Sequence, residues 1–305
     1  MTEPIAVLGP GGIGGMLAAR TGAICVGTER TVATIRTAGL MLVDGDTTSL
    51  THPEAVERLE TRVALLVVAV KAYDLDAALE RVPPATLEGA VVLPLLNGLE
   101  HLDALRRRFG TRDTASLARP PAVAAGSIGR VEAFSPEPGV VVQRTAAAAV
   151  VEAASREADT GTLAEALAPL RVPGIDVVVR DDERAVLWNK AARLAVLAAA
   201  TAASGRTVGE LRDDAAWRER LVAALDEAVA VALADGVTLS ASDQWGMIAA
   251  MPPDLTTSTA RDAAAGRRTE LDAITGSVVR AARLHAIQTP VLEEISAEAS
   301  ARCAA

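Results

Sequence analysis

The sequence contains few aromatic residues and fewer basic residues than acidic ones. Aromatic side chains make up 2% of the 305 residues, and 39 acidic residues against 30 basic ones give a formal net charge of −9. Proteins that bind nucleic acids attract the phosphate backbone with basic surfaces and stack the bases on aromatic rings. The composition therefore argues against a nucleic-acid partner.

Cysteines and long apolar runs are scarce as well. The two cysteines, Cys25 and Cys303, show no spacing typical of a disulfide framework or a metal site. The apolar run at residues 63–70 is far too short to span a membrane. The N-terminus lacks the basic and apolar stretches of a signal peptide. We expect a cytoplasmic protein with no metal and no membrane partner.

A chain of 305 residues is long for a single hydrophobic core, so we expect two domains. The apolar runs Ile5–Leu8, 63–70 and 91–96 are typical of strands buried on both faces of a parallel sheet. Helical stretches at 75–81 and 100–109 follow the second and third of these runs. This alternation predicts an α/β domain with a Rossmann-type, doubly wound sheet.

The pattern changes between residues 122 and 179, where Val- and Gly-rich runs surround a turn at 135–139. This change predicts a hairpin-containing extension of the sheet. Helical spacing then returns and predicts an all-helical C-terminal domain. We place the dinucleotide-binding domain at residues 1–180 and the helical domain at 181–305. Helices of the second domain are expected at 185–203, 213–235 and 269–285.

A glycine motif follows the first strand. Gly9, Gly11 and Gly14 fit the pattern G-x-G-x-x-G. Glycine allows a tight turn and lets backbone N–H groups approach a pyrophosphate. A helix that begins near Gly12 points the positive end of its dipole at the phosphates. A purely structural turn is the alternative, but the strand–turn–helix context favours a dinucleotide site formed by Gly9, Gly11, Gly12, Ile13 and Gly14.

The second strand, at residues 24–27, ends where a ribose-binding group is expected. Glu29 is suited to accept a hydrogen bond from the 2′-hydroxyl of NAD, whereas Thr28 and Arg30 suit the 2′-phosphate of NADP. The first helix is short, which leaves open which of these residues faces the ribose. Physical reasoning alone does not choose between NAD and NADP.

Further motifs follow in a distinctive order. Val70-Lys71-Ala72-Tyr73 closes one apolar strand, and Leu96-Asn97-Gly98 closes the next. Trp188-Asn189-Lys190 opens the second domain, and Ser258 lies twelve residues before Glu270. Together with the glycine loop, these motifs resemble the ketopantoate reductase (2-dehydropantoate 2-reductase) family over nearly the whole chain.

The resemblance implies NADPH-dependent reduction of a 2-keto acid to a 2-hydroxy acid. It assigns Lys190 as the proton donor and Glu270 as the group that holds Lys190 or the substrate. Hydride addition to a carbonyl leaves negative charge on oxygen, which a positioned ammonium can stabilise and protonate. Without the resemblance, the site residues it assigns would be interpreted as ordinary surface, turn or helix-capping residues. The other implied site residues are Ser258, Lys71 and Thr201 for the substrate and Lys71 and Asn97 for the nicotinamide end.

The sequence departs from the family at the substrate end. The family carries asparagines four and eight residues after the helix lysine, where this chain has Leu194 and Ala198. Each lost hydrogen bond to the substrate weakens binding by about 1–3 kcal/mol. We therefore expect a substrate that is less hydroxylated or more apolar than ketopantoate. Arg193, on a neighbouring edge of the helix, is either a carboxylate anchor or, as favoured by its residue type, a solvent-exposed side chain.

Two other functions remain open at this point. The missing asparagines favour a protein that binds the dinucleotide as a sensor or regulator without turnover. A related dehydrogenase acting on an imine or another carbonyl compound would use the same fold. The alanine- and leucine-rich helices suit either a homodimer interface or packing within one chain.

Overall fold

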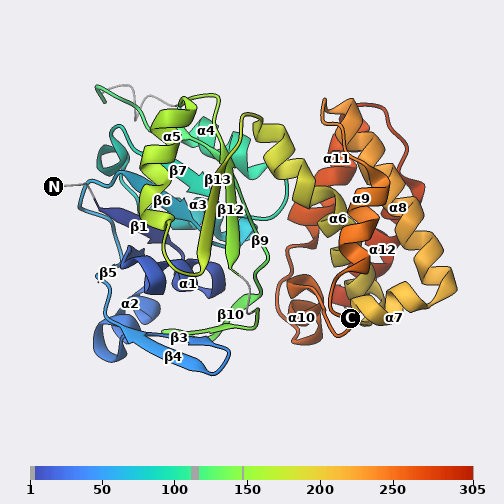
Figure 1. The fold of residues 1–305 in the computed structure, drawn as a ribbon, viewed down its shortest axis with the longest axis horizontal. Helices are drawn as coiled ribbons and strands as arrows, with labels where there is room; N and C mark the ends of the chain where they lie inside the picture. The colour runs from blue at the N-terminus through green and yellow to red at the C-terminus, as the bar shows by residue number, and fades with distance from the viewer. Residues whose placement is uncertain (1–3, 111–116, 146–147, 305) are drawn as a thin grey trace. The chain divides into compact units, whose positions relative to one another are not determined.

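The structure is a computed structural model that describes residues 4–110, 117–145 and 148–304. The chain forms two compact units, which Figure 1 colours from blue to green and from yellow to red. The last division between them falls after Val186, inside helix α6 (Glu183–Ser204). The first unit comprises Met1–Leu96 and His101–Val186, and the second comprises Asn97–Glu100 and Leu187–Ala305.

A six-stranded parallel sheet forms the centre of the first unit. The chain moves outward from β1 to β2 and β5, then returns to the other side of β1 with β6, β7 and β8. Val7 pairs with Cys25 on one side and Val67 on the other, and all three side chains are fully buried. This reversal confirms the predicted doubly wound, Rossmann-type sheet. Its strands are β1 (Ile5–Leu8), β2 (Ile24–Val26), β5 (Ala55–Val56), β6 (Leu65–Val68), β7 (Val91–Pro94) and β8 (Ala122–Val123).

The strands beyond β8 do not extend this sheet, so that prediction is wrong. One hairpin pairs with a second hairpin from the first third of the chain and forms a separate four-stranded sheet. The remaining strands form a sheet of three. The four-stranded sheet contains β10 (Ala133–Glu137), β11 (Val140–Gln143), β3 (Leu40–Asp44) and β4 (Thr47–Thr51), and the three-stranded sheet contains β9 (Ala125–Gly129), β12 (Ala149–Ala154) and β13 (Ile175–Val179).

The turn of the β10–β11 hairpin is shorter than the sequence predicts. Ser135, Pro136 and Glu137 belong to β10, and the pairing register shifts between Phe134 and Glu137. Proline has no N–H to donate, and β10 lies at the edge of its sheet, where a missing donor is tolerated. The irregular register therefore accommodates residues that resemble a turn in the sequence.

Helix α1 (Gly12–Thr21) contacts β1 of the parallel sheet and also β3, β10 and β11 of the four-stranded sheet. Because two sheets cover it, its central residues Met16, Leu17 and Ala18 are fully buried. The expected helices near residues 75 and 100 are present as α3 and α4. The other helices and 3₁₀ turns of this unit are α2 (Glu29–Ala38), η1 (Ala72–Asp74), α3 (Leu75–Leu79), η2 (Pro84–Leu87), α4 (His101–Phe109), α5 (Thr160–Leu167) and η3 (Ala168–Leu170).

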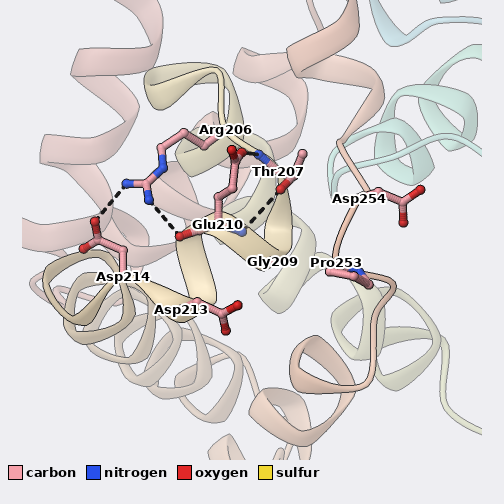
Figure 2. Close-up of a pocket in the computed structure, with 8 residues that line it drawn as sticks. All are labelled: Arg206, Thr207, Gly209, Glu210, Asp213, Asp214, Pro253 and Asp254. Carbon is pink, nitrogen blue, oxygen red and sulfur yellow. Dashed lines mark hydrogen bonds and ion pairs between the residues drawn. The ribbon is translucent and has the colours of Figure 1, made fainter.

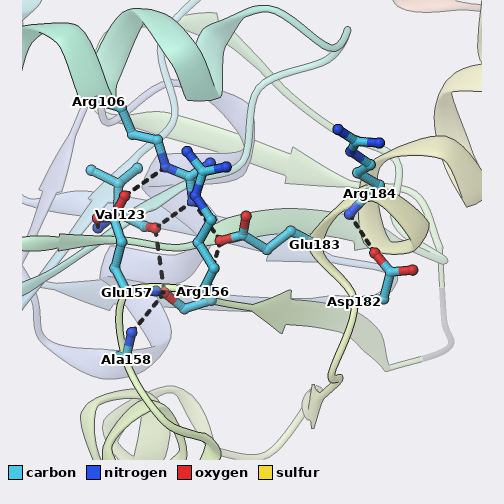
Figure 3. Close-up of polar contacts among 9 residues, drawn as sticks. Arg106, Val123, Arg156, Glu157, Ala158, Asp182, Glu183 and Arg184 are labelled. Atoms are coloured by element: carbon cyan, nitrogen blue, oxygen red, sulfur yellow. Dashed lines mark hydrogen bonds and ion pairs between the residues drawn. The ribbon is translucent and has the colours of Figure 1, made fainter. Parts of the chain in front are cut away.

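A polar network in the first unit holds the first turn of α6, as Figure 3 shows. Arg106 on α4 forms ion pairs with Glu157, at 2.7 Å, and with Glu183. Glu157 also accepts a hydrogen bond from the backbone N–H of Val123, and Glu183 accepts one from that of Arg156. The side chains of Arg106 and Glu183 are only 12% and 11% exposed. The network therefore anchors the start of α6 in a largely desolvated setting.

Among the described residues of the second unit, all regular secondary structure is helical. Trp188 on α6 is fully buried, and its indole N–H donates a hydrogen bond of 2.7 Å to Asp235. A π-helical turn interrupts the helix expected at 269–285. Among the residues that the structure describes, no helix has the length and apolar character needed to cross a membrane. The other helices are α7 (Val208–Asp213), α8 (Ala215–Ala234), α9 (Ala241–Ala249), α10 (Ser258–Ala264), the π-helix η4 (Asp272–Gly276), α11 (Ser277–Leu284) and α12 (Pro290–Ala304).

Candidate active site

The three motif glycines of the first unit each meet a different steric requirement. Gly9 adopts a φ of +89°, and a Cβ on it would lie 2.5 Å from Val70 Cγ1. A Cβ on Gly14 would lie 2.1 Å from the carbonyl oxygen of Gly9, so this glycine lets α1 pack against the loop. A Cβ on Gly11 would meet nothing within 4 Å, so the backbone here borders open space. A tight turn, close helix packing and an accessible backbone are the features of a pyrophosphate-binding loop.

Gly12 has a packing role that the motif did not predict. A Cβ at this position would lie 2.4 Å from the carbonyl oxygen of Ala133 and 2.7 Å from Cα of Phe134, both in β10. The glycine therefore lets the hairpin backbone pass directly over the start of α1. Ile13 packs against the core of the first unit. Both residues also lie in the first turn of α1, where backbone N–H groups have no acceptor within the helix.

Polar residues follow β2 and β6. Thr28 caps α2 by accepting a hydrogen bond from the backbone N–H of Thr31. Glu29 and Arg30 occupy the first turn of α2, and both are exposed. An acidic and a basic side chain are thus both accessible at the position expected to bind the ribose. Lys71, which is partly buried, directly precedes η1.

Lys190 lies on α6 in the second unit and is partly buried. Burial lowers the pKa of Lys190 to about 8, the charge of Arg193 contributes to this lowering, and the carboxylate of Glu270 opposes it. Glu270 itself is only 5% exposed. A lysine whose pKa lies this close to neutrality is suited to give up a proton during a reaction.

Arg193, one turn after Lys190, is partly buried rather than solvent-exposed. Its Nη1 donates hydrogen bonds to the carbonyl oxygen of Asn189 and to Oε1 of Gln244, the latter at 2.8 Å. Gln244 belongs to α9 and is only 3% exposed. Sequence reasoning missed Gln244, because 51 residues separate it from Arg193 and no motif connects the two.

Lys190, Leu194, Ala198 and Thr201 form a stripe along one face of α6. Between Lys190 and Thr201 this stripe is apolar. Leu194 is partly buried and Ala198 is fully buried. Thr201 has no exposed surface, donates a hydrogen bond to the carbonyl oxygen of Leu197 and lies 2.7 Å from the hydroxyl of Thr257. Thr257 is the N-cap of α10, whose first residue is the partly buried Ser258. Thr201 therefore supports the segment that carries Ser258.

The segment Asn97–Glu100 belongs to the second unit, although the residues on either side of it belong to the first. Gly98 has a φ of +92°, and a Cβ on it would lie 1.9 Å from the carbonyl oxygen of Ala273 in the π-helix. Arg280 pairs with both carboxylate oxygens of Glu100, at 2.7 and 2.8 Å. Asn97 is thus held in the unit that carries Lys190.

The π-helix lies close to Glu270 in the chain and contacts the helix that carries Lys190. It begins at Asp272, two residues after Glu270. Thr275, which it contains, donates a hydrogen bond of 2.8 Å to the carbonyl oxygen of Ala195 on α6. Short π-helical turns occur frequently at functional sites. Here the turn links the helix that bears Lys190 to the segment that bears Glu270.

Figure 2 shows a separate pocket in the second unit, and none of the predicted site residues lines it. Two of its carboxylates already cap helices. The backbone N–H of Thr207 lowers the pKa of Glu210, and that of Trp217 lowers the pKa of Asp214. These two carboxylates of the pocket lining therefore serve to stabilise helix N-termini. Its residues are Arg206, Thr207, Gly209, Glu210, Asp213, Asp214, Pro253 and Asp254.

Known protein families match both parts of the chain. Residues 5–156 match the family described as ketopantoate reductase PanE/ApbA, and residues 182–302 match its C-terminal domain. The 2-dehydropantoate 2-reductase of Halobacterium salinarum is 30% identical over 96% of both chains. That of Mycobacterium tuberculosis is 32% identical over 95% of both chains.

Solved structures show the same fold. A PanE/ApbA family ketopantoate reductase from Ralstonia eutropha JMP134 is 26% identical, with a TM-score of 0.82 over 99% of this chain and 98% of that one. D-mandelate dehydrogenase, solved with NADH and anilino(oxo)acetate, has a TM-score of 0.85 over the same shares at 19% identity. The second likeness concerns the fold alone.

Proposed function

Because the chain belongs to the ketopantoate reductase family, we propose that it reduces a 2-keto acid to a 2-hydroxy acid with NADPH and that Lys190 donates the proton. One observation carries this proposal. The partly buried Lys190 interacts electrostatically with Glu270, a buried carboxylate of the same unit. A lysine removed from bulk water and balanced by one carboxylate has the chemistry of a general acid.

The first unit is suited to hold the dinucleotide, which supplies a hydride when bound. The open space beside Gly11 leaves room for a pyrophosphate near the backbone of residues 9–14. We assign Thr28 and Arg30 to the 2′-phosphate of NADPH, because Arg30 is exposed in the first turn of α2. Lys71 is assigned to the dinucleotide through the family resemblance.

The second unit supplies the acid. Reduction of a carbonyl leaves negative charge on its oxygen, which the ammonium of Lys190 stabilises and then protonates. With a pKa of about 8, Lys190 is mostly protonated at neutral pH. The carboxylate of Glu270 favours the charged form and offsets part of the penalty of burial. Ser258 is assigned to the substrate, and Asn97 to the nicotinamide, through the family resemblance.

The substrate that we propose has fewer hydroxyl groups than ketopantoate. Leu194 and Ala198 replace the family's asparagines with side chains that cannot form hydrogen bonds. A buried polar group of the substrate without a partner lowers affinity, whereas an apolar group gains from contact with such a surface. Keto acids with aliphatic or aromatic side chains fit this stripe better.

Steady-state oxidation of NADPH and NADH over a panel of 2-keto acids tests these assignments. We expect NADPH and an apolar keto acid to give the highest kcat/KM. Lys190→Met should lower kcat by about 10²- to 10⁴-fold. Lys190→Arg is the matched control, because it keeps the charge and cannot release a proton at neutral pH. It should be equally slow, while both variants retain the wild-type affinity for NADPH.

Each alternative predicts a different result. Tight NADPH binding with no oxidation across the panel would identify a sensor. Faster turnover of imines than of keto acids would identify the related dehydrogenase. A wide preference for ketopantoate would contradict the proposal about Leu194 and Ala198. Full activity of Lys190→Met would contradict its role as proton donor.

A further inference from the structure

We propose that strand β4 of the first unit pairs with β4 of a second copy of this chain, in an antiparallel arrangement with two-fold symmetry. The four-stranded sheets of the two copies then continue across the interface as one sheet. The inference concerns a surface of the first unit and does not depend on the reaction proposed above.

β4 is an edge strand without the features that usually block edge pairing. It lies at one end of the four-stranded sheet, beside β3, as Figure 1 shows. Its sequence, Thr-Thr-Ser-Leu-Thr, contains no proline and no charge, and four of its five residues are exposed. Proteins commonly protect such edges with proline or charged side chains. The opposite edge strand of the same sheet, β10, contains both, at Pro136 and Glu137.

The backbone of β4 presents hydrogen-bonding groups at this free edge. Leu50 is the antiparallel partner of Met41 on β3. The N–H of Met41 donates to the carbonyl oxygen of Gly139 at 2.8 Å, on the side of β3 away from β4. In an antiparallel ladder, two opposite residues that do not bond to each other both point their N–H and C=O groups outward. Leu50, and Thr48 two residues before it, therefore direct these groups away from β3.

One register pairs all five residues of β4 with the five residues of its copy. It places Ser49 opposite Ser49 of the second copy and Thr48 opposite Leu50, so outward donors meet outward acceptors. The same register places Asp46, in the turn before β4, opposite His52, directly after it. Both residues are exposed, and an imidazole N–H donates readily to a carboxylate. The two ends of the strand are therefore complementary to each other, and two-fold symmetry uses this match twice.

The outer face of the hairpin supplies apolar surface for the same interface. Leu50 is 52% exposed, and Met41, opposite it on β3, is 37% exposed. Diagonal neighbours across two antiparallel strands are within reach of long side chains. In the proposed register, Leu50 of each copy is the diagonal neighbour of Leu50 of the other. The two leucines and the two methionines then form one cluster that is shielded from water.

Cysteine cross-linking tests the register. Ser49 lies on the two-fold axis, where the Cα atoms of opposite residues are about 4.5 Å apart, a distance that a disulfide can span. Thr47 is equally exposed but faces Thr51 of the second copy, so it lies far from its own counterpart. Both substitutions are made with Cys303→Ser, because Cys25 is buried and Cys303 is the more accessible thiol. After mild oxidation, we expect Ser49→Cys to give a covalent dimer on a non-reducing gel and Thr47→Cys to remain monomeric.

Analytical ultracentrifugation of the full chain over a wide range of concentrations measures the dissociation constant of the dimer. Leu50→Lys removes the apolar contact and places two lysines near each other across the axis, so it should raise this constant by about 10- to 30-fold. The matched control is Leu233→Lys, at an apolar residue on α8 that is 60% exposed. It should dimerise like the wild type. Both sites are exposed, so neither lysine should change the melting temperature.

A charge exchange tests the ends of the strand. Asp46→Lys sets a lysine opposite His52, and His52→Glu sets a glutamate opposite Asp46. Each change alone should weaken the dimer. The double variant restores opposite charges across the interface and should return the dissociation constant to near the wild-type value.

Four results would overturn the inference. The first is a wild type that stays monomeric at every concentration. The second is equal cross-linking of Ser49→Cys and Thr47→Cys. The third is a dimer that Leu233→Lys weakens and Leu50→Lys does not, since its interface would then lie on the helical unit. The fourth is a double charge variant that is no better than its weaker single variant, because the proposed register requires the two ends to meet.

Discussion

Replacement of Gly98 by alanine should damage both the stability and the activity of the second unit. Gly98 has a φ of +92°, a backbone conformation that residues with a side chain rarely adopt. It also packs directly against the π-helix. A Cβ would lie 1.9 Å from the carbonyl oxygen of Ala273 and 2.9 Å from its carbonyl carbon. Both contacts are with backbone atoms, which cannot move aside as a flexible side chain can. Either the Asn97 turn or the π-helix must shift.

Two costs contribute to the expected effect. A left-handed backbone conformation costs a residue with a Cβ about 1–2 kcal/mol. Overpacking against a fixed neighbour costs about 1–3 kcal/mol more. We therefore expect Gly98→Ala to lower the free energy of unfolding by about 2–5 kcal/mol, the sum of these two ranges. A displacement of the Asn97 amide should also reduce kcat/KM.

Gly266→Ala is the matched control. Gly266 also has a positive φ, +62°, but a Cβ on it would meet nothing within 4 Å. It should show only the conformational cost, about 1–2 kcal/mol, and wild-type kinetics. Urea denaturation and steady-state NADPH oxidation measure the two effects. Equal stabilities of the two variants, with unchanged kinetics, would refute the steric argument for Gly98.

Four further predictions concern other parts of the chain. Because the proton donor is the charged form of Lys190, kcat/KM should fall as the pH rises through about 8; Lys190→Arg should abolish this dependence. The same lysine should raise the free energy of unfolding as the pH rises from about 8 towards 10.5, since in this range the unfolded chain binds more protons than the folded one. Urea denaturation of the wild type and of Lys190→Met across this pH range would detect the difference. Gly11→Ala should lose NADPH affinity and keep its melting temperature, whereas Gly14→Ala should lose stability; the opposite pattern would contradict the roles assigned to the loop. Arg106→Met should cost about 3 kcal/mol, because it leaves the largely buried carboxylate of Glu183 without its arginine, and Arg108→Met, at a more exposed pair, under about 1 kcal/mol by the same denaturation assay.

The parallel sheet could be predicted because its signals are local. A strand buried on both faces appears as a short apolar run, and β1 has the predicted bounds, Ile5–Leu8. The hairpin of β3 (Leu40–Asp44) and β4 (Thr47–Thr51) was missed, since the short β4 is largely exposed and has no apolar period. Its partner hairpin was assigned to the wrong sheet. The pairing of β3 with β11 joins segments about a hundred residues apart, and no local pattern encodes such a contact.

The candidate site shows a similar division. The positive φ of Gly9 and the contact of Gly14 with the carbonyl oxygen of Gly9 lie within the loop itself, so a local motif can predict them. The environment of Lys190 depends instead on Glu270, which lies eighty positions away, and only the family resemblance connected the two. Arg193 shows the limit most clearly. Its residue type favours exposure to solvent, whereas its contact with Gln244 across two helices leaves it partly buried.

The charges on α6 suggest why the second unit retains polar groups that its packing does not need. A lysine whose pKa is lowered by burial destabilises the folded chain at neutral pH, because its charged form has lost part of its hydration. Arg193 adds to that cost, and Glu270 offsets part of it. A further carboxylate beside Lys190 would favour the protonated lysine more strongly. A keto-acid substrate carries such a group. If a keto acid binds with its carboxylate beside Lys190, it raises the pKa of that lysine, which ties recognition of the acid to the protonation of its reaction partner.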